Sequence, residues 1–159
     1  MAISITVRLA REEDAESVSA CLGSAFEPFR SQYTGEAFED TVLTPEAVRV
    51  RMRHMTVYVA NVADGAVVAT IATAFEGKEG HLRGMAVLPA WQGRFIAEHL
   101  LRAVEDDLVA AGCERVTLDT TLPLQRAISF YERNGFVPSG RVTDFIGMRL
   151  YEYAKILPR

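Results

Sequence analysis

Two stretches of the chain hold residue types and spacings that could do chemistry. In the first, a strand-like run from Leu82 ends at Pro89, and a short loop brings Gln92-Gly93-Arg94 to the start of an apolar-periodic segment. Free backbone N–H groups and the helix dipole at such a junction attract anions, and Gly93 lets a ligand approach the backbone closely. Arg94 adds a cation beside them. These residues indicate a phosphate or pyrophosphate site, although an ordinary strand-to-helix turn with a surface arginine also accounts for them.

The second stretch, from Ala127 to Phe136, predicts a buried tyrosine. On a helix, Ala127, Phe130 and Tyr131 share one face, which turns the Tyr131 phenol toward the interior. A buried phenol needs a polar partner. Taken alone, these residues favour a core tyrosine whose hydroxyl bonds to the backbone, so a chemical role needs support from elsewhere.

Taken together and in this order, the two stretches resemble the GCN5-related N-acetyltransferase (GNAT) family. The run from Ala86 to Pro89, followed by Gln92-Gly93-Arg94-x-Ile96-Ala97, is similar to the family's pyrophosphate loop, Gln/Arg-x-x-Gly-x-Gly/Ala. The run from Phe130 to Phe136 is similar to its late helix-turn motif. The resemblance implies a fold in which the strands at 81–88 and 115–121 splay apart and admit the pantetheine arm of acetyl-CoA.

The resemblance also implies roles for individual residues. Tyr131 matches the general acid that protonates the departing CoA thiolate, and a phenol of pKa about 10 can donate to a thiolate of pKa about 8.5 or somewhat above. The backbone of residues 85–87 is expected to bind the pantetheine and polarise the thioester carbonyl. The cofactor-binding residues expected are Met85, Ala86, Val87, Gln92, Gly93, Arg94, Phe95, Ile96, Ala97, Arg126 and Tyr131.

Two residues depart from the family pattern. Phe95 stands where the loop has its central glycine, so the ring either points away from the anion site or weakens cofactor binding. Leu124 lies seven residues before Tyr131, where the family often has an asparagine that contacts the cofactor, so that contact is expected to be missing. Neither change removes the main-chain donors of the loop.

No motif marks a general base. An amine must be neutral to attack, and a lysine-like ammonium has a pKa of about 10.4, so some group must take its proton. Glu76 and His81 are the main candidates for the general base, and Glu79 and Asp119 are two further candidates. A solvated His81, surface carboxylates and a chain of water molecules are the alternatives.

The acceptor is expected over the splayed strands, walled by the segment between the first two helices. Phe26, Phe29, Arg30 and Tyr33 lie in that segment and could form a pocket with a cation that meets a substrate carboxylate. Aromatic packing under a long loop explains the same residues. His54 and His99 fall on expected helices and form no ligand spacing with His81, so no metal site is expected.

Composition narrows the classes of function. The chain has 159 residues, with 17 Lys and Arg against 21 Asp and Glu, a formal net charge of −4. A mildly acidic chain without a long basic run is not expected to bind nucleic acid, and no apolar stretch reaches the roughly 20 residues that span a membrane. Two cysteines without CxxC spacing, and an N-terminus that alternates like a strand rather than a signal peptide, favour a cytoplasmic protein with free thiols.

Periodicity and turn signals predict the elements that hold these residues. Thr44-Pro45-Glu46 should begin a helix that runs to about Met55, and a long amphipathic helix should begin near Gln92. A last pair of strands is expected around a turn at 141–144, and the segment 27–42 is expected to be a loop or a broken helix. The order is β-α-α-β-β-β-α-β-α-β-β, an α/β (α+β) fold with a mixed, mostly antiparallel sheet and helices on both faces, in one domain over residues 1–159.

The function expected from the resemblance is an acetyl-CoA-dependent N-acetyltransferase that acts on a primary amine of a small molecule by direct attack in a ternary complex. A non-catalytic acyl-CoA-binding sensor or interaction module on the same fold is one alternative, motivated by Phe95 and Leu124. A protein N-terminal or lysine acetyltransferase is another. Acetyl-CoA is the expected cosubstrate and a homodimer is compatible with the family. The acidic first half of the chain favours a cationic amine partner.

Overall fold

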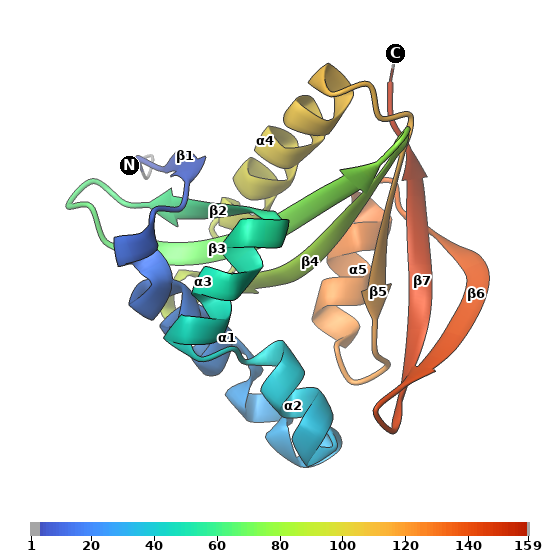
Figure 1. Cartoon of the computed structure of the whole chain (residues 1–159), viewed down its shortest axis with the longest axis horizontal. Helices are drawn as coiled ribbons and strands as arrows, with labels where there is room; N and C mark the ends of the chain where they lie inside the picture. Colours follow the sequence, from blue (N-terminus) through green and yellow to red (C-terminus); the bar gives the residue numbers. More distant parts are fainter. Residues whose placement is uncertain (1–3, 159) are drawn as a thin grey trace.

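The computed structural model describes residues 4–158 and contains a seven-stranded sheet in the order β1-β2-β3-β4-β5-β7-β6 (Figure 1). Neighbouring strands are antiparallel except β4 and β5, which are parallel. The strands are β1 (Thr6–Leu9), β2 (Thr56–Asn61), β3 (Val67–Glu76), β4 (Glu79–Val87), β5 (Arg115–Thr120), β6 (Val137–Phe145) and β7 (Met148–Ile156). The helices are α1 (Ala15–Phe26), α2 (Gly35–Thr41), α3 (Pro45–His54), α4 (Ile96–Ala110) and α5 (Gln125–Arg133).

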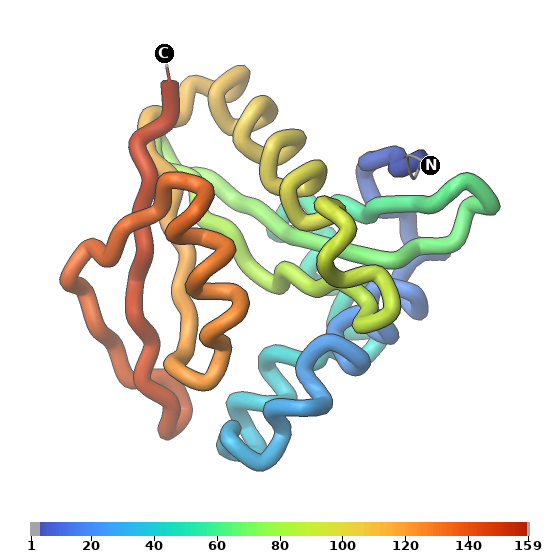
Figure 2. Tube along the Cα trace, turned by 180° about the vertical axis from the view of Figure 1, so that it is seen from behind, coloured from blue at the N-terminus to red at the C-terminus, as the bar shows by residue number. Residues whose placement is uncertain are grey.

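Helices cover both faces of the sheet. The first three helices lie on one face, and α4 and α5 lie on the other (Figures 1 and 2). Because successive strand residues point to opposite faces, Val57 and Val59 of β2 are buried in the core under α1, while Tyr58 and Ala60 are buried in the core under α4. The predicted fold class is therefore confirmed. No helix among residues 4–158 is long and apolar enough to cross a membrane.

The sheet opens between its two parallel strands. β4 and β5 pair only from Glu79–Arg115 to Leu82–Leu118, although β4 continues to Val87 and β5 to Thr120. On its other side β4 stays paired with β3 through a bulge, where Ile71 is opposed by two residues of β4. The first of these, Gly84, has a φ of 64°, which a glycine adopts without strain. A bulge bends the strand that carries it, and this one lies just beyond the point where β4 and β5 stop pairing.

Two segments near this opening refine the predicted elements. The segment 27–42 is a broken helix, one of the two predicted alternatives: a 3-10 segment, Glu27–Gln32, is followed by the short helix α2, which adds one helix to the predicted order. The long helix α4 begins at Ile96 rather than near Gln92, because Gly93 and Phe95 have positive φ angles of 77° and 64°.

The closing turn was predicted in the wrong place. β6 runs through 141–144, and the turn is Ile146-Gly147, with φ angles of 48° and 78°. Isoleucine rarely adopts a positive φ, so the sequence around Ile146 does not indicate a turn. Gly140 lies instead within a register shift of β6, between Pro138 and Val142. The strand-like N-terminus forms β1 (Thr6–Leu9), and residues 1–3 lie outside the described residues.

Candidate active site

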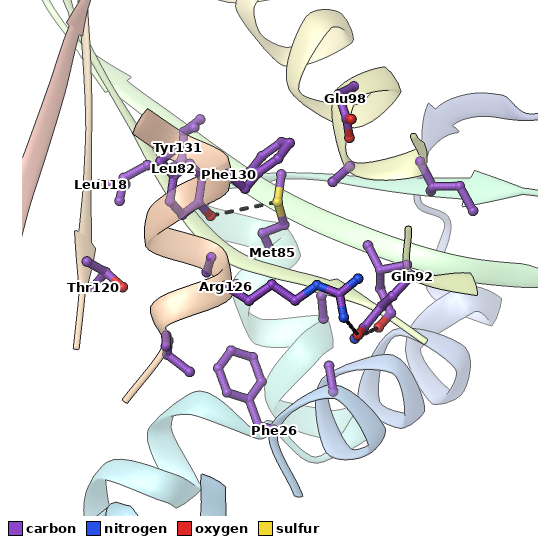
Figure 3. Close-up of a pocket in the computed structure, with 18 of the residues that line it drawn as sticks. Phe26, Leu82, Met85, Gln92, Glu98, Leu118, Thr120, Arg126, Phe130 and Tyr131 are labelled. Carbon is purple, nitrogen blue, oxygen red and sulfur yellow. Dashed lines mark hydrogen bonds between the residues drawn. The ribbon is translucent and has the colours of Figure 1, made fainter. Parts of the chain in front are cut away.

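A cavity of about 400 Å³ lies where β4 and β5 separate, and we call it the splay cavity. Its walls come from α1, β4, the loop before α4, β5 and α5 (Figure 3). Leu82 and Leu118, the last pair of the parallel ladder, line its closed end. Beyond them, residues 84–87 of β4 have no strand partner on the β5 side, so backbone groups of this edge are available to a ligand.

The end of the splay cavity near α4 is suited to an anion. Ile96, Ala97 and Glu98 occupy the first helical positions, and the first intrahelical bond is donated by the His99 N–H to the Phe95 carbonyl oxygen at 3.3 Å. The N–H groups of the first turn therefore have no acceptor within the helix, and the helix dipole makes this end positive. The Glu98 side chain also lines the cavity, so nearby cations are needed to offset its charge.

Arg126 supplies such a cation from the cavity wall, and Arg94 lies in the loop before α4. Arg126 of α5 reaches toward the loop before α4, and its Nη1 donates to Gln92 Oε1 at 3.3 Å (Figure 3). Gln92 Nε2 in turn donates to the Val87 carbonyl oxygen at 3.0 Å, which ties the loop to the end of β4. The Arg94 guanidinium lies over the ring of Trp91, 5.0 Å from its centroid; Trp91 lines the splay cavity and Arg94 does not. Residues from both walls of the splay thus meet beside the same helix N-terminus.

The structure resolves where the Phe95 ring lies. Phe95 is the N-cap of α4, with left-handed backbone, and 71% of its surface is exposed. Phe95 lines the splay cavity, although most of its surface faces solvent. Leu124, the second departure, precedes α5 and lines the cavity with an apolar side chain that caps nothing.

Tyr131 points into the splay cavity from α5. Its residue is 8% exposed, and its hydroxyl lies 3.7 Å from Met85 Sδ across the opening (Figure 3). The Phe130 and Phe136 rings pack edge-on against the phenol at centroid distances of 5.4 and 5.6 Å. Burial raises the pKa of Tyr131 above its ordinary value of 10, so the phenol is protonated at neutral pH. A thioether is a weak acceptor, and the hydroxyl is therefore free to donate to a ligand.

A second cavity, of about 460 Å³, adjoins the first on the side of α1, α2, α3 and the β6–β7 turn, and we call it the adjoining cavity. The two cavities share a wall, made of Phe26, Leu82, Arg83, Gly84, Asp119, Thr120 and Leu124. The Tyr33 hydroxyl lies 3.0 Å from Thr121 Oγ1, and Thr34 Oγ1 donates to the Ile146 carbonyl oxygen at 2.7 Å. These two hydrogen bonds join the segment between α1 and α2 to the far side of the cavity.

His81 lines the adjoining cavity. Its Nδ1 lies 2.8 Å from Thr117 Oγ1, and its Nε2 lies 3.8 Å from Asp119 Oδ2. Thr117 Oγ1 is also 3.5 Å from the Gly80 carbonyl oxygen, and when it donates there it accepts from Nδ1–H and leaves the Nε2 lone pair free. Burial lowers the pKa of His81 below its ordinary value of 6.5, against the opposing effect of Asp119. The imidazole is therefore neutral at neutral pH and able to accept a proton.

Several predicted residues lie away from this site. Glu76 is exposed at the β3–β4 turn and lines neither cavity, and Glu79 pairs there with Arg115 at 2.7 Å. Arg30 also lines neither: it pairs with Glu27 at 2.8 Å and lies over the Phe38 ring. Glu76 is thus removed from the candidate bases and Arg30 from the candidate acceptor residues. The aromatics do line cavities: Phe26 both, Phe29 the splay cavity and Tyr33 the adjoining one.

Two site residues were missed from the sequence. Arg51 of α3 lines the adjoining cavity, and Thr120 at the end of β5 lines both. Thr120 is 4% exposed, and in the part of the chain described here its Oγ1 is the one buried side-chain polar atom without a hydrogen-bond partner. A buried hydroxyl without a partner costs free energy, which a ligand in the shared wall would offset.

Comparison with known proteins identifies the family. The model of the acetyltransferase (GNAT) family matches residues 16–136. The chain belongs to the GNAT acetyltransferase family. The match runs from α1 past the end of α5, so it includes both stretches that carried the resemblance, which is thereby confirmed.

Solved structures of other proteins share the fold along almost the whole chain. The PaiA N-acetyltransferase from Thermoplasma acidophilum, solved in complex with coenzyme A, has a TM-score of 0.76 at 21% identity and covers 96% of this chain and 99% of its own. The ribosomal-protein-S18-alanine N-acetyltransferase from Escherichia coli has a TM-score of 0.77 at 15% identity, with 98% and 96% covered. Ard1 from Thermoplasma volcanium has a TM-score of 0.78 at 20% identity, with 98% and 99% covered. At these sequence identities, the likeness to the three structures concerns the fold alone.

Proposed function

We propose that this GNAT protein transfers an acetyl group from acetyl-CoA to the primary amine of a small molecule, by direct attack in a ternary complex. The observation that carries the proposal is the pair of cavities that share a wall at Gly84, Asp119 and Thr120. A donor held in the splay cavity and an acceptor held in the adjoining cavity meet at that wall.

The residues of the splay cavity fit acetyl-CoA. The unpaired edge of β4 offers backbone donors and acceptors to the amide-bearing pantetheine arm, and the first turn of α4 with Arg94 and Arg126 offers positive charge to the pyrophosphate. Thr120 Oγ1 is a buried polar atom in need of a partner at the same wall. Acetyl-CoA supplies an acetyl group on a thioester, which is activated toward an amine.

Tyr131 has the role of general acid in this proposal. As the amine nitrogen bonds to the thioester carbon and the carbon–sulfur bond breaks, the phenol donates its proton to the sulfur of the departing CoA. Burial keeps the phenol protonated until that charge develops, and its hydroxyl has only the Met85 thioether as a partner in the described residues. Its interaction is therefore stronger in the transition state than in the ground state.

His81 is the base that the geometry favours. Its neutral imidazole accepts the proton that the amine nitrogen loses, directly or through water, and Asp119 stabilises the imidazolium that results. Both side chains line the adjoining cavity, and Asp119 belongs to the shared wall. One proton thus leaves the amine for His81 while another leaves Tyr131 for the CoA sulfur.

Direct attack is supported by the positions of the two cysteines. Cys21 and Cys113 are 1% and 4% exposed, and neither lines a cavity. Burial raises the pKa of Cys21 to about 11, and it raises the pKa of Cys113 as well. Neither thiol is a nucleophile at neutral pH, so an acetyl-cysteine intermediate is not expected.

A small acceptor is supported by the contacts that close the adjoining cavity. A peptide substrate needs a groove that is open at both ends, because its chain continues past the reacting amine. Here the Tyr33–Thr121 and Thr34–Ile146 hydrogen bonds connect the α1–α2 segment to β5 and to the β6–β7 turn, across the path of such a chain. A Cβ on Gly147 would lie only 2.9 Å from Thr34 Cγ2, so this contact is tight.

The proposal is tested by thiol release from acetyl-CoA with two panels of acceptors, one of free small amines and one of peptides with free N-termini and lysines. We expect turnover with members of the small-amine panel, intersecting initial-velocity lines and no acetylated protein by mass spectrometry when the amine is omitted. Measurable CoA binding without turnover of any amine would contradict an enzymatic role. Turnover of peptides alone would contradict the small acceptor.

A further inference from the structure

Arg51 is a charged side chain of the adjoining cavity that no other protein group neutralises. It lies on α3, is half-buried and lines the cavity, yet among residues 4–158 its guanidinium has no hydrogen bond or ion pair. Other partly buried arginines are paired: Arg8 with Asp14 at 2.7 Å, and Arg115 with Glu79 at 2.7 Å and Glu152 at 3.5 Å. A desolvated cation without a partner is costly, so this one calls for an anion.

The charges around Arg51 do not supply that anion. Asp40 lines the same cavity, but its carboxylate is bound by Arg83 at 2.5 Å. Burial and the repulsion of Arg83 lower the pKa of Arg51 to about 10, against a smaller opposing effect of Asp40. The guanidinium is still charged at neutral pH. This end of the cavity therefore holds two cations and one carboxylate, and it carries a positive excess.

The Arg51 guanidinium also reaches the wall that the two cavities share. A Cβ built on Gly84 would lie 2.7 Å from Arg51 Nη1, and Gly84 belongs to that wall. The left-handed backbone of the β4 bulge and the absence of a side chain at Gly84 together leave room for the guanidinium. A group bound by Arg51 is thus near the place where the two cavities meet.

The opposite charge lies on β5 in the same wall. Asp119, the acidic residue of the wall, faces His81 from there, and no arginine of the described residues pairs with it. A cationic amine is attracted to Asp119 before it loses its proton, while an anionic group is attracted to Arg51. The cavity therefore has a negative side and a positive side, both within reach of one small molecule.

We infer that the acceptor is a compact primary amine that also carries an oxyanion, as an amino acid does, and that Arg51 binds this oxyanion. A guanidinium binds a carboxylate or a related oxyanion through two parallel N–H donors, which would orient the amine as well as hold the molecule. The inference rests on the proposed function, because it assigns the adjoining cavity to the acceptor.

The first test measures binding without the donor. Calorimetric titration of the protein with the standard L-amino acids and with the matching amines that lack the carboxylate should show saturable binding of at least one amino acid and weaker binding of its amine. Arg51→Met keeps the length of the side chain and removes its charge, and it should weaken that amino acid about 10- to 100-fold. Arg51→Lys should retain part of the affinity. Arg53→Met, on an exposed position of the same helix, is the matched control and should bind as the unmodified protein does.

The second test measures acetylation of the same compounds. Arg51→Met should raise the KM of the amino acid about 10- to 100-fold, and it should raise the KM of the matching amine without a carboxylate, and the KM for acetyl-CoA, much less. Equal kcat/KM for an amino acid and its amine in the unmodified protein, or equal amino acid binding by Arg51→Met, would overturn the inference. If Arg51→Met fails to fold, Arg51→Lys decides the question: its preference for the amino acid should be smaller than that of the unmodified protein, since lysine cannot form the two parallel bonds, and an unchanged preference would overturn the inference.

The two proposals fail in different ways. If amino acids bind in a manner that depends on Arg51 but no amine is acetylated, Arg51 is still the residue that binds the oxyanion, and the proposed function is wrong. If amines are acetylated without regard to the oxyanion or to Arg51, the proposed function stands and the inference is wrong.

Discussion

Replacing Tyr131 with phenylalanine separates chemistry from packing, because it removes one oxygen and leaves the ring contacts intact. If the phenol is the general acid, Tyr131→Phe should lower kcat by about 100- to 10,000-fold, the range that a positioned proton donor contributes. The KM for acetyl-CoA should change little, since the interaction strengthens only as charge develops on the sulfur.

The effect of the same change on stability follows from the hydroxyl's surroundings. Its partner is the Met85 thioether at 3.7 Å, a weak acceptor, so losing it should alter the free energy of unfolding by less than about 1 kcal/mol. Tyr58 provides the control, because its buried hydroxyl donates to the Asp107 carboxylate at 2.6 Å and lines neither cavity. Tyr58→Phe should cost about 1.5 kcal/mol, or about 3–6 °C in Tm, and leave kcat unchanged.

The assay pairs steady-state kinetics of thiol release with thermal unfolding followed by circular dichroism. The two variants should show opposite signatures, with Tyr131→Phe inactive and stable, and Tyr58→Phe active and less stable. An unchanged kcat in Tyr131→Phe would refute its role as the acid. A fall in Tm of several degrees in that variant would refute the argument that its hydroxyl is nearly unpartnered in the folded protein.

Three further predictions test other parts of the site. Phe95→Gly should be about 1 kcal/mol more stable than Phe95→Ala by thermal or urea unfolding, because both lose the ring and only glycine accepts a φ of 64° without strain; equal stabilities would contradict this. The value of kcat/KM should fall as the pH drops through the lowered pKa of His81, below 6.5, because the protonated imidazole cannot accept a proton. His81→Asn should abolish this acidic limb of the pH profile. A limb that persists in the variant excludes His81 as the base. Gly147→Ala and Gly140→Ala should each lower the free energy of unfolding by about 1–2 kcal/mol, because both positions have a positive φ. Only Gly147→Ala should raise the KM for the acceptor, because its Cβ would press against Thr34. The same KM in both variants would show that the β6–β7 turn does not shape the cavity.

The elements with a strong period or a local cap could be predicted from sequence. Leu100, Val104 and Leu108 repeat at helical spacing and are all buried on α4. Thr44 caps α3 by accepting from the Ala47 N–H at 3.2 Å, as its position before Pro45 predicts. In these segments local preference and tertiary packing favour the same structure, so a short window of sequence is enough to predict the helix.

The β6–β7 turn could not be predicted because tertiary contacts override its local signal. Gly140 has nothing within 4 Å of its missing side chain and marks an irregular stretch of β6, whereas Gly147 forms the turn against Thr34 of a distant segment. The two glycines look alike in sequence, and only the partner across the cavity distinguishes them.

The choice between two arginines shows the same limit at the site. Arg30 follows Glu27 by three residues, a spacing that pairs side chains on helical segments, and this signal pointed away from a free cation. Arg51 shares a helix face with buried Val48 and with Met55, so the periodic pattern placed a charge toward the interior. The sequence does not show which surface α3 covers, because that surface depends on the bulge at Gly84.

The separation of β4 from β5 also gives the sheet additional unpaired strand edges. An ordinary open sheet has two edge strands, here β1 and β6, whereas the separation of β4 from β5 creates two more inside the molecule. Exposed strand edges invite pairing with other chains and so promote aggregation. Residues of α1, of α5 and of the loop before α4 lie along these inner edges. A strand of another chain would have to displace them in order to pair with β4, so the walls of the site also shield its free strand edges.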